Sequence, residues 1–224
     1  VVGLLNVLEA MLISNVNAIV FSSSSSVYAD ADVLPTPETC KTKPMSPYAT
    51  QKVAAENYLY SYTLKHNIFA TCLRYFNVYG ERMKTSGAYS TVIGKFLDKL
   101  KTTDANKILE ITNDGQQRRD FTYVGDVVNA NLRAMDQLKK QIAIKKLTPE
   151  RKIDKYYVYN VGTGKNYSVL DIANIFPLKH KFIGEVIEPK ETLANNTEIR
   201  YRLGWSSTTD VLEWVSEEIK KVRG

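Results

Sequence analysis

Apolar residues in the first half of the chain alternate between helical spacing and short continuous runs. Asn6–Leu12 carries apolar residues at helical spacing, which predicts a helix, whereas Asn17–Phe21 is a short apolar run that predicts a buried strand. Ser46-Pro47 indicates the start of a second helix, because serine is a favoured cap and proline is tolerated in a first turn. Phe69–Tyr75 is typical of the next buried strand.

The second half of the chain continues this alternation. We expect a strand over Tyr157–Val161 and helices over Val92–Leu100, Asp126–Leu138, Val169–Ile175 and Asp210–Val222. Strands and helices that alternate in this way predict an α/β fold with a parallel sheet. A chain of 224 residues that is 44% hydrophobic and 24% charged suits one globular unit with a substantial core, possibly with a smaller lobe.

The net charge is +6, and part of the basic excess lies between Lys139 and Lys155. This run could form a nucleic-acid or membrane-surface patch, or it could be a solvated surface loop after a helix. No RNA-binding aromatic motif or helix-turn-helix pattern accompanies it, so we expect the loop and no nucleic-acid partner. No apolar run approaches the ~20 residues of a membrane span, so we expect no membrane partner. A positive balance also suits anionic nucleotide substrates.

The remaining reactive residues do not form a metal site in the sequence. Cys40 and Cys72 lack metal-ligand spacing and make no disulfide framework, and the two histidines stand alone. We therefore expect no bound metal and a reduced, cytoplasmic compartment. The segment Gly162–Lys165 resembles a phosphate-binding loop, but the required glycine and hydroxyl residue are replaced by Tyr159 and Asn166, so it predicts a simple turn.

A run of five serines, Ser22–Ser26, follows the first predicted strand, and Tyr48 and Lys52 lie on the next predicted helix. Ligands of open α/β sheets bind at strand carboxyl ends, which argues against a low-complexity linker. The Y-x-x-x-K spacing puts tyrosine and lysine one turn apart on one helix face. A nearby ammonium favours the phenolate, so Tyr48 can act as a general base while a serine holds the same substrate hydroxyl.

Five blocks resemble, in order and spacing, the extended short-chain dehydrogenases/reductases that act on nucleotide sugars: SSSSVYAD, SPYATQK, LRYFNVYG, DGQQRRDFTYVGDVVNA and YNVGTG. The resemblance covers nearly the whole chain and implies a Rossmann-like doubly wound parallel sheet with a small α/β substrate-binding lobe. Residues 1–80 would form part of the NAD-binding domain. Residues 81–224 would form mostly the substrate-binding lobe, with residues 120–165 returning to the sheet.

The resemblance implies roles for residues that match the family motifs. Ser24 corresponds to the serine that assists catalysis, with Ser25 as the nearest alternative. Tyr48 corresponds to the catalytic base, and Lys52 to the lysine that holds the nicotinamide ribose. The residues implied to contact NAD are Ser22, Ser23, Tyr48, Lys52, Tyr75 and Phe76. Taken alone, Tyr75 and Phe76 could equally be core aromatic residues.

A second set of residues is implied to contact a UDP-sugar substrate. These are Ser24, Asn77, Thr91, Val92, Phe96, Glu110, Thr112 and Arg119. Arg119 corresponds to an arginine that binds the pyrophosphate, and a guanidinium fork suits that anion. Its neighbour Arg118 is the alternative at this position, and Arg119-Asp120 could instead be a surface ion pair.

Within the family, the stretch Gly87–Ile93 most resembles UDP-glucose and UDP-N-acetylglucosamine 4-epimerases. The implied reaction is NAD-dependent epimerisation of a UDP-hexose or UDP-N-acetylhexosamine through a transient 4-keto intermediate. Related dehydratases carry an Asp-Glu pair after a threonine where this chain has Ser24–Ser26, so a 4,6-dehydratase or a reductase is a less favoured alternative. A non-catalytic remnant, or one half of a split protein that binds a sugar nucleotide or a partner subunit, is the other alternative.

Two segments depart from the family pattern. No G-x-x-G-x-x-G run exists among the 11 glycines, so we expect an N-terminally truncated member that binds NAD poorly unaided. Ile187–Ala194 stands where relatives have an R-x-G-D stretch, with Lys190 and Glu191 expected to substitute in part. Relatives often dimerise through the tyrosine-bearing helix and the helix before it. The implied partner is therefore a second copy, or another chain that supplies the N-terminal half.

Overall fold

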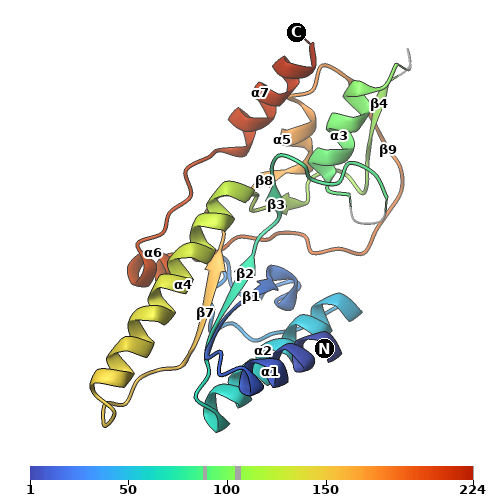
Figure 1. The fold of residues 1–224 in the computed structure, drawn as a ribbon. Helices are drawn as coiled ribbons and strands as arrows, with labels where there is room; N and C mark the ends of the chain where they lie inside the picture. The colour runs from blue at the N-terminus through green and yellow to red at the C-terminus, as the bar shows by residue number, and fades with distance from the viewer. Residues whose placement is uncertain (88–89, 104–106, 224) are drawn as a thin grey trace.

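A three-stranded parallel sheet forms the lower part of the molecule (Figure 1). The computed structural model describes residues 1–87, 90–103 and 107–223. The sheet has the order β1-β2-β7, with bounds Ala18–Ser24, Phe69–Tyr75 and Tyr156–Val161. The register aligns Ser24 with Tyr75 and Tyr75 with Val161, so the carboxyl ends of the three strands meet at one edge. This confirms the predicted α/β fold with a parallel sheet.

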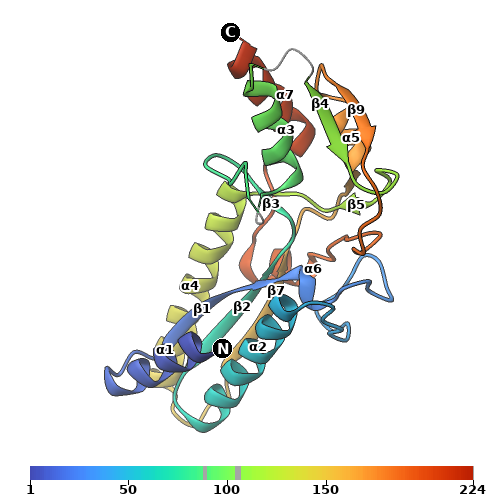
Figure 2. The same ribbon diagram turned by 90° about the vertical axis from the view of Figure 1, so that its right-hand side faces the viewer.

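Helices cover both faces of this sheet because side chains on a strand alternate between faces. Ala70 and Cys72 of β2 pack toward α1 (Val2–Ile13) and α2 (Pro47–Lys65). Phe69 and Leu73 pack on the opposite face, in a cluster that includes side chains of α4 (Val124–Leu147) and α6 (Thr197–Leu203). Figures 1 and 2 show α4 on one side of the sheet and α1 with α2 on the other. The homodimer predicted through α1 and α2 stays a prediction.

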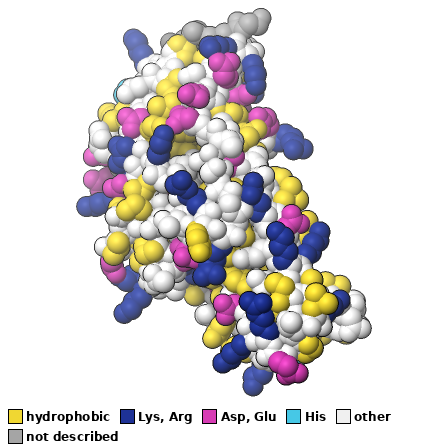
Figure 3. Space-filling model, turned by 90° about the vertical axis from the view of Figure 1, so that its left-hand side faces the viewer, with side chains coloured by type: hydrophobic (Ala, Val, Ile, Leu, Met, Phe, Trp, Pro, Cys, Tyr) yellow, Lys and Arg dark blue, Asp and Glu magenta, His cyan; other side chains and the backbone are white. Residues whose placement is uncertain are grey.

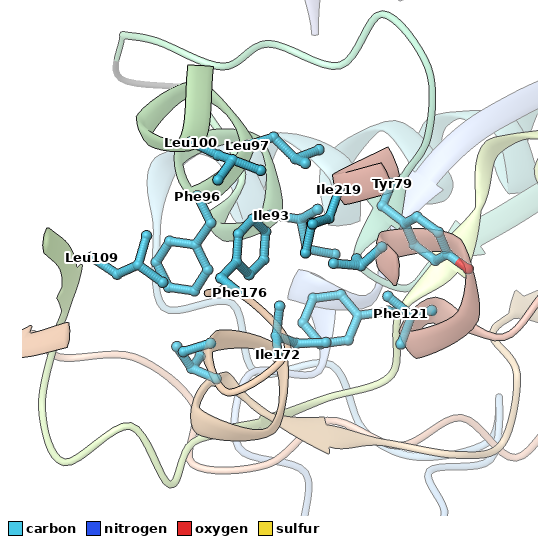
Figure 4. Packing of buried hydrophobic residues seen from close by; sticks show 14 of the residues in the cluster. Tyr79, Ile93, Phe96, Leu97, Leu100, Leu109, Phe121, Ile172, Phe176 and Ile219 are labelled. Carbon is cyan, nitrogen blue, oxygen red and sulfur yellow. The ribbon is translucent and has the colours of Figure 1, made fainter. Parts of the chain in front are cut away.

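A second lobe lies beyond the carboxyl ends of the strands (Figure 1). Its helices are α3 (Val92–Lys101), α5 (Val169–Ala173) and α7 (Val211–Arg223), and its parallel strand pair is β4 (Ile108–Ile111) with β9 (Lys179–Phe182). Aromatic and branched side chains fill its core, where Phe96 and Phe176 meet edge to face at 5.5 Å (Figure 4). The elements of the lobe are short, so this shared core holds them together.

Short strand pairs join the sheet to the second lobe. β3 (Val78–Tyr79) pairs in parallel with β6 (Thr122–Tyr123), and β5 (Arg118–Arg119) pairs antiparallel with β8 (Tyr167–Ser168). The turn η1 (Ser25–Val27) follows β1 directly. The division of the chain at residue 80 stays a prediction. After that residue the chain returns to the three-stranded sheet, where β7 is a strand and α4 packs against one face.

The basic segment after residue 138 is mostly helix, so the predicted surface loop is wrong over most of its length. α4 continues to Leu147, because lysine, glutamine and alanine favour helices and Ile142 packs against the sheet cluster. Lys and Arg side chains on the face in Figure 3 lie among Asp, Glu and hydrophobic side chains rather than in one continuous basic surface. Among the described residues, no helix is long and apolar enough to cross a bilayer.

Candidate active site

Tyr48 and Lys52 lie in the first two turns of α2, beside the carboxyl end of β1. The helix begins here because the Ser46 hydroxyl accepts a hydrogen bond from the Ala49 amide at 3.1 Å. Lys52 Nζ donates to the Ser22 carbonyl oxygen at 2.6 Å and lies 5.5 Å from the centre of the Tyr48 ring. Partial burial lowers the pKa of Lys52. Tyr48 and Lys52 therefore lie side by side on α2, and the hydrogen bond of Lys52 attaches this part of the helix to the end of β1.

The serine run divides between two faces of β1. Ser22 Oγ is hydrogen bonded to the Tyr75 hydroxyl at 3.1 Å, and Ser24 Oγ accepts from the Ser26 hydroxyl at 2.9 Å. Ser23 points to the opposite side, is 2% exposed, and donates to the Glu56 carboxylate. Ser24 is the last residue of β1, and η1 begins directly after it.

Ser24, Tyr48 and Tyr75 line a pocket of about 400 Å³ at the carboxyl ends of β1 and β2, whereas Ser22 and Lys52 are not among its lining residues. Its walls include Ser24, Tyr48 and Tyr75, with Asn77 and Arg119 on the side of the second lobe. Tyr48 is 53% exposed, so its phenol is accessible to a ligand. The predicted serine and tyrosine therefore share one pocket although they are 24 residues apart in the sequence.

A second pocket of about 370 Å³ extends into the other lobe and shares Asn77, Val78, Arg119 and Glu188 with the first. Every residue of the second lobe and its junction that was predicted to contact the substrate lines this pocket. The seven residues are Asn77, Thr91, Val92, Phe96, Glu110, Thr112 and Arg119. The two pockets together make an elongated site, which suits a ligand with a sugar at one end and a nucleoside at the other.

Arg119, rather than its neighbour, faces both pockets. Its residue is 9% exposed, and its Nη2 donates to Glu188 Oε2 at 2.7 Å. The Arg118 side chain is 41% exposed and turns away to bond Asn166 and Asp171. Successive residues of a strand point to opposite sides, which separates the two arginines. The surface ion-pair alternative for Arg119-Asp120 is wrong, because Asp120 is fully buried and Arg119 pairs with Glu188.

Glu188 is a site residue that the sequence did not single out. Its carboxylate also accepts from Asn113 Nδ2 at 3.1 Å and Gln117 Nε2 at 3.3 Å. The segment expected to supply Lys190 and Glu191 to the site supplies Glu188 to both pockets, while those two residues line a neighbouring pocket that shares Glu188 and Gln117 with the second pocket. Gln117 could have been found from its position two residues before Arg119, on the same side of an extended segment.

Several predicted residues have structural contacts beside any role in binding. Phe76 is 1% exposed, packs against Tyr28, and lines neither pocket. Thr91 Oγ1 caps α3 by accepting from the Gly94 amide at 3.1 Å. Glu110 forms an exposed ion pair with Lys181 at 3.0 Å. Ala88 and Tyr89, within the predicted epimerase-like stretch Gly87–Ile93, lie outside the described residues.

The chain is similar to known sugar-nucleotide enzymes along almost its whole length. It is 34% identical over 226 residues to a putative UDP-glucose 4-epimerase of Methanocaldococcus jannaschii, covering 98% of this chain and 67% of that protein. The crystal structure of a Thermotoga maritima UDP-glucose 4-epimerase with UDP-glucose has a TM-score of 0.84 at 27% identity, covering 100% of this chain and 69% of the other.

A further solved structure belongs to a UDP-N-acetylglucosamine 4-epimerase of Methanobrevibacter ruminantium, in complex with UDP-N-acetylmuramic acid. Its TM-score is 0.81 at 28% identity, covering 97% of this chain and 66% of the other. The NAD dependent epimerase/dehydratase family model matches residues 1–162, which include both predicted catalytic motifs. With a Rossmann-like parallel sheet, a Tyr-Lys pair at its carboxyl edge and these relatives, the chain belongs to the NAD dependent epimerase/dehydratase family.

Proposed function

We propose that this chain carries the sugar-binding and proton-transfer residues of a UDP-hexose or UDP-N-acetylhexosamine 4-epimerase. The observation that carries the proposal is that the two pockets adjoin and share lining residues. One pocket presents Ser24 and Tyr48, and it shares Asn77 and Arg119 with the pocket in the second lobe. This length of site suits a sugar beside the serine and tyrosine, with the diphosphate at Arg119 and the nucleoside beyond it.

The residues of the first pocket suit reversible oxidation at a sugar carbinol carbon. Tyr48 removes the proton of the 4-hydroxyl and later returns it, while Ser24 holds the same oxygen. Lys52 lies one helical turn after Tyr48, with its Nζ 5.5 Å from the centre of the tyrosine ring. Inversion then requires the 4-keto sugar to turn over between the two hydride transfers, with Arg119 retaining the diphosphate.

The geometry around Lys52 fits the nicotinamide ribose of NAD. An ammonium has three donors, and Lys52 uses one of them on the Ser22 carbonyl oxygen, which leaves two for ribose hydroxyls. Tyr75, fixed by Ser22 and by Asn131 at 2.9 Å, provides a wall beside that position. Bound NAD supplies the hydride acceptor and, once reduced, the hydride donor.

Elimination of water is less well supported than epimerisation. A dehydratase needs an acid and a base beside the sugar, and the residues after Ser24 are Ser25 and Ser26. Among the described residues that line the first pocket, Glu188 is the one carboxylate, and it is paired with Arg119. Besides that carboxylate and the Arg119 guanidinium, the polar groups of the pocket are hydroxyl and amide groups, which hold and orient a sugar without removing a carbon-bound proton.

Product analysis tests the proposal directly. The chain is fused to the NAD-binding N-terminal segment of a relative and incubated with NAD and UDP-glucose or UDP-N-acetylglucosamine, and the sugar products are followed by proton NMR. Epimerisation produces the galacto isomer of each substrate, with no change in mass. Loss of water from the sugar would contradict the proposal and favour a dehydratase, and net oxidation or reduction of the substrate would favour a reductase.

Arg119→Ala is expected to weaken UDP binding by ~1.5–3 kcal/mol, the usual value of a hydrogen bond to a charged group. Arg119 is nearly buried and lies where the two pockets meet, so its guanidinium can bond a diphosphate with little competition from water. Calorimetry with UDP measures the change. Arg118→Ala is the matched control, because Arg118 bonds Asn166 outside both pockets. Equal losses for the two variants would contradict the assignment.

Glu188→Gln is expected to tighten UDP binding by about 3–10-fold, equivalent to roughly 1 kcal/mol at a partly exposed site. The Glu188 carboxylate occupies Arg119 and would repel a diphosphate that approaches it, whereas glutamine keeps the size and can still bond Asn113 and Gln117. Calorimetry at two salt concentrations measures the gain, which falls at high salt if it is electrostatic. Weaker binding by the variant would show that the carboxylate contacts the ligand directly.

A further inference from the structure

A buried ion pair lies directly behind the serine and tyrosine pocket. Arg74 of β2 and Glu56 of α2 are 5% and 4% exposed. Arg74 Nη2 donates to Glu56 Oε2 at 2.6 Å, and Arg74 Nε donates to Glu56 Oε1 at 3.0 Å. The two groups thus form a bidentate fork, the arrangement with the most definite geometry between a guanidinium and a carboxylate.

The pair is extended into a network that joins four further segments. Ser23 Oγ of β1 donates to Glu56 Oε1, so the carboxylate is tied to the strand end. On the other side, Arg74 Nη1 donates to the Tyr28 hydroxyl at 2.7 Å and to a backbone carbonyl oxygen at 3.1 Å. The Tyr28 hydroxyl in turn donates to Asn160 Oδ1 of β7 at 2.7 Å. One network therefore links β1, β2 and β7 to α2.

Each member of the network that lies near the pocket is a sequence neighbour of a pocket residue. Ser23 precedes Ser24, and Arg74 precedes Tyr75, so fixing one fixes the backbone of the other. Glu56 lies one helical turn after Lys52 and two turns after Tyr48, on the face of α2 that meets the sheet. Ser23 also lines the pocket, whereas the side chains of Glu56 and Arg74 are buried and are not among the residues that line it.

Burial of two charges is costly unless the geometry is good and the remaining donors and acceptors are bonded. Both conditions hold here, because Glu56 accepts three hydrogen bonds and Arg74 donates from all three of its nitrogens. An apolar pair of similar size would fill the same space but would not fix the helix in one register against the strands. The two directional hydrogen bonds between Arg74 and Glu56 do set the register of α2 against the strands.

We propose that Glu56 and Arg74 are positioning residues that hold the Tyr48–Lys52 face of α2 in register with the ends of β1 and β2. The inference rests on the proposed epimerase function, because it concerns the alignment of Tyr48 and Ser24 on one sugar hydroxyl. Small displacements of a reacting group can cost about 10²-fold in rate. Loss of the fork would therefore lower turnover while the Arg119 pocket still binds UDP.

The alternative is that the pair acts through charge on Lys52. The two roles predict different patterns. Glu56→Gln leaves a lone cation behind the pocket, whereas Arg74→Gln leaves a lone anion, so a role through charge would shift the pH profile of kcat in opposite directions. A positioning role lowers kcat in both variants and leaves the two profiles with the same shape. Arg74→Lys keeps the charge but loses the fork, and on the positioning role it also lowers kcat.

The experiment measures kcat, KM for UDP-glucose and the UDP dissociation constant for these variants, with NAD present and with the NAD-binding N-terminal segment of a relative fused to each chain. We expect kcat to fall about 10-fold or more, with KM and UDP affinity within about 2-fold of the parent chain. Ser23→Ala, which removes the link from β1 to Glu56 and leaves the Glu56–Arg74 fork in place, should show a smaller fall of the same kind. Glu198→Gln, which breaks the exposed pair of Glu198 with Arg202 at 2.7 Å, is the control and should change nothing.

A spectroscopic measurement tests the proposal without relying on turnover. It also does not depend on the Arg74 variants being folded. The chain is labelled with 3-fluorotyrosine, and the Tyr48 fluorine resonance is assigned by its loss in Tyr48→Phe. The resonance should shift or broaden in Ser23→Ala and Glu56→Gln and stay in place in Glu198→Gln. If the fused parent chain shows no epimerisation, the proposed function fails, and this measurement still decides the positioning role. An unmoved resonance, unchanged kcat in folded variants, or opposite shifts of the pH profiles would overturn it.

Discussion

Tyr48→Phe, in the chain fused to the NAD-binding N-terminal segment of a relative, is expected to lower turnover of a UDP-sugar by ~10²-fold or more, the usual loss when a general base is removed. Phenylalanine keeps the ring that packs against Lys52 and loses only the group that accepts the sugar proton. Arg119 and the pocket of the second lobe are unaffected by the change, so UDP binding should stay within about 2-fold of the parent chain. The loss therefore appears in kcat and not in the dissociation constant.

The measurement compares kcat with the UDP dissociation constant from calorimetry on the same preparation. Tyr58→Phe is the matched control, because Tyr58 lies on the same helix, is 39% exposed, and lines neither pocket. Near-normal turnover by Tyr48→Phe would remove this residue from the mechanism. A parallel loss in the control would instead indicate damage to α2 as a whole.

Elements with a strong local signal were predicted close to their observed bounds. β2 was predicted at its observed bounds, because its residues are almost all buried and the apolar run has no competing pattern. The start of α2 was predicted because Ser46 and Pro47 make a specific cap. In contrast, α4 was ended too early at Leu138, because its last turns are amphipathic and rich in lysine, which resembles a polar loop.

Elements that depend on distant partners could not be predicted. β9 has four exposed residues and exists because it pairs with β4, about 70 residues earlier in the chain. α6 has seven residues, too few for a clear periodicity, and it is stabilised by burying Ile199 and Leu203 under the sheet. Propensity is a weak signal at such lengths, so tertiary packing decides the structure.

The residues of the candidate site show the same difference between local patterns and distant contacts. Tyr48 and Lys52 are four residues apart on one helix, so a motif in the sequence reveals their proximity. Glu188 meets Arg119 across 69 residues, from a segment with no regular secondary structure, so no local pattern could reveal that contact.

Asp120→Ala is expected to lower the free energy of unfolding by about 3 kcal/mol or more, because each unsatisfied buried donor costs ~1–3 kcal/mol. Asp120 is fully buried, and its carboxylate accepts from the amide and hydroxyl of Thr163 at 2.8 Å and from the amides of Gly164 at 3.0 Å and Ala194 at 3.1 Å. Burial raises the pKa of the Asp120 carboxyl, and these donors oppose that rise.

The loss should be cooperative, because the Asp120 carboxylate joins three parts of the chain. It follows β5, and its donors come from the turn after β7 and from the segment that carries Glu188 to Arg119. Urea unfolding should show a lower midpoint with an unchanged slope. Asp136→Ala, at an exposed and long ion pair of 3.9 Å, is the control and should change stability by less than about 0.5 kcal/mol. A loss below 1 kcal/mol for Asp120→Ala would mean that water reaches the freed amides, and that this junction is more open than its burial indicates.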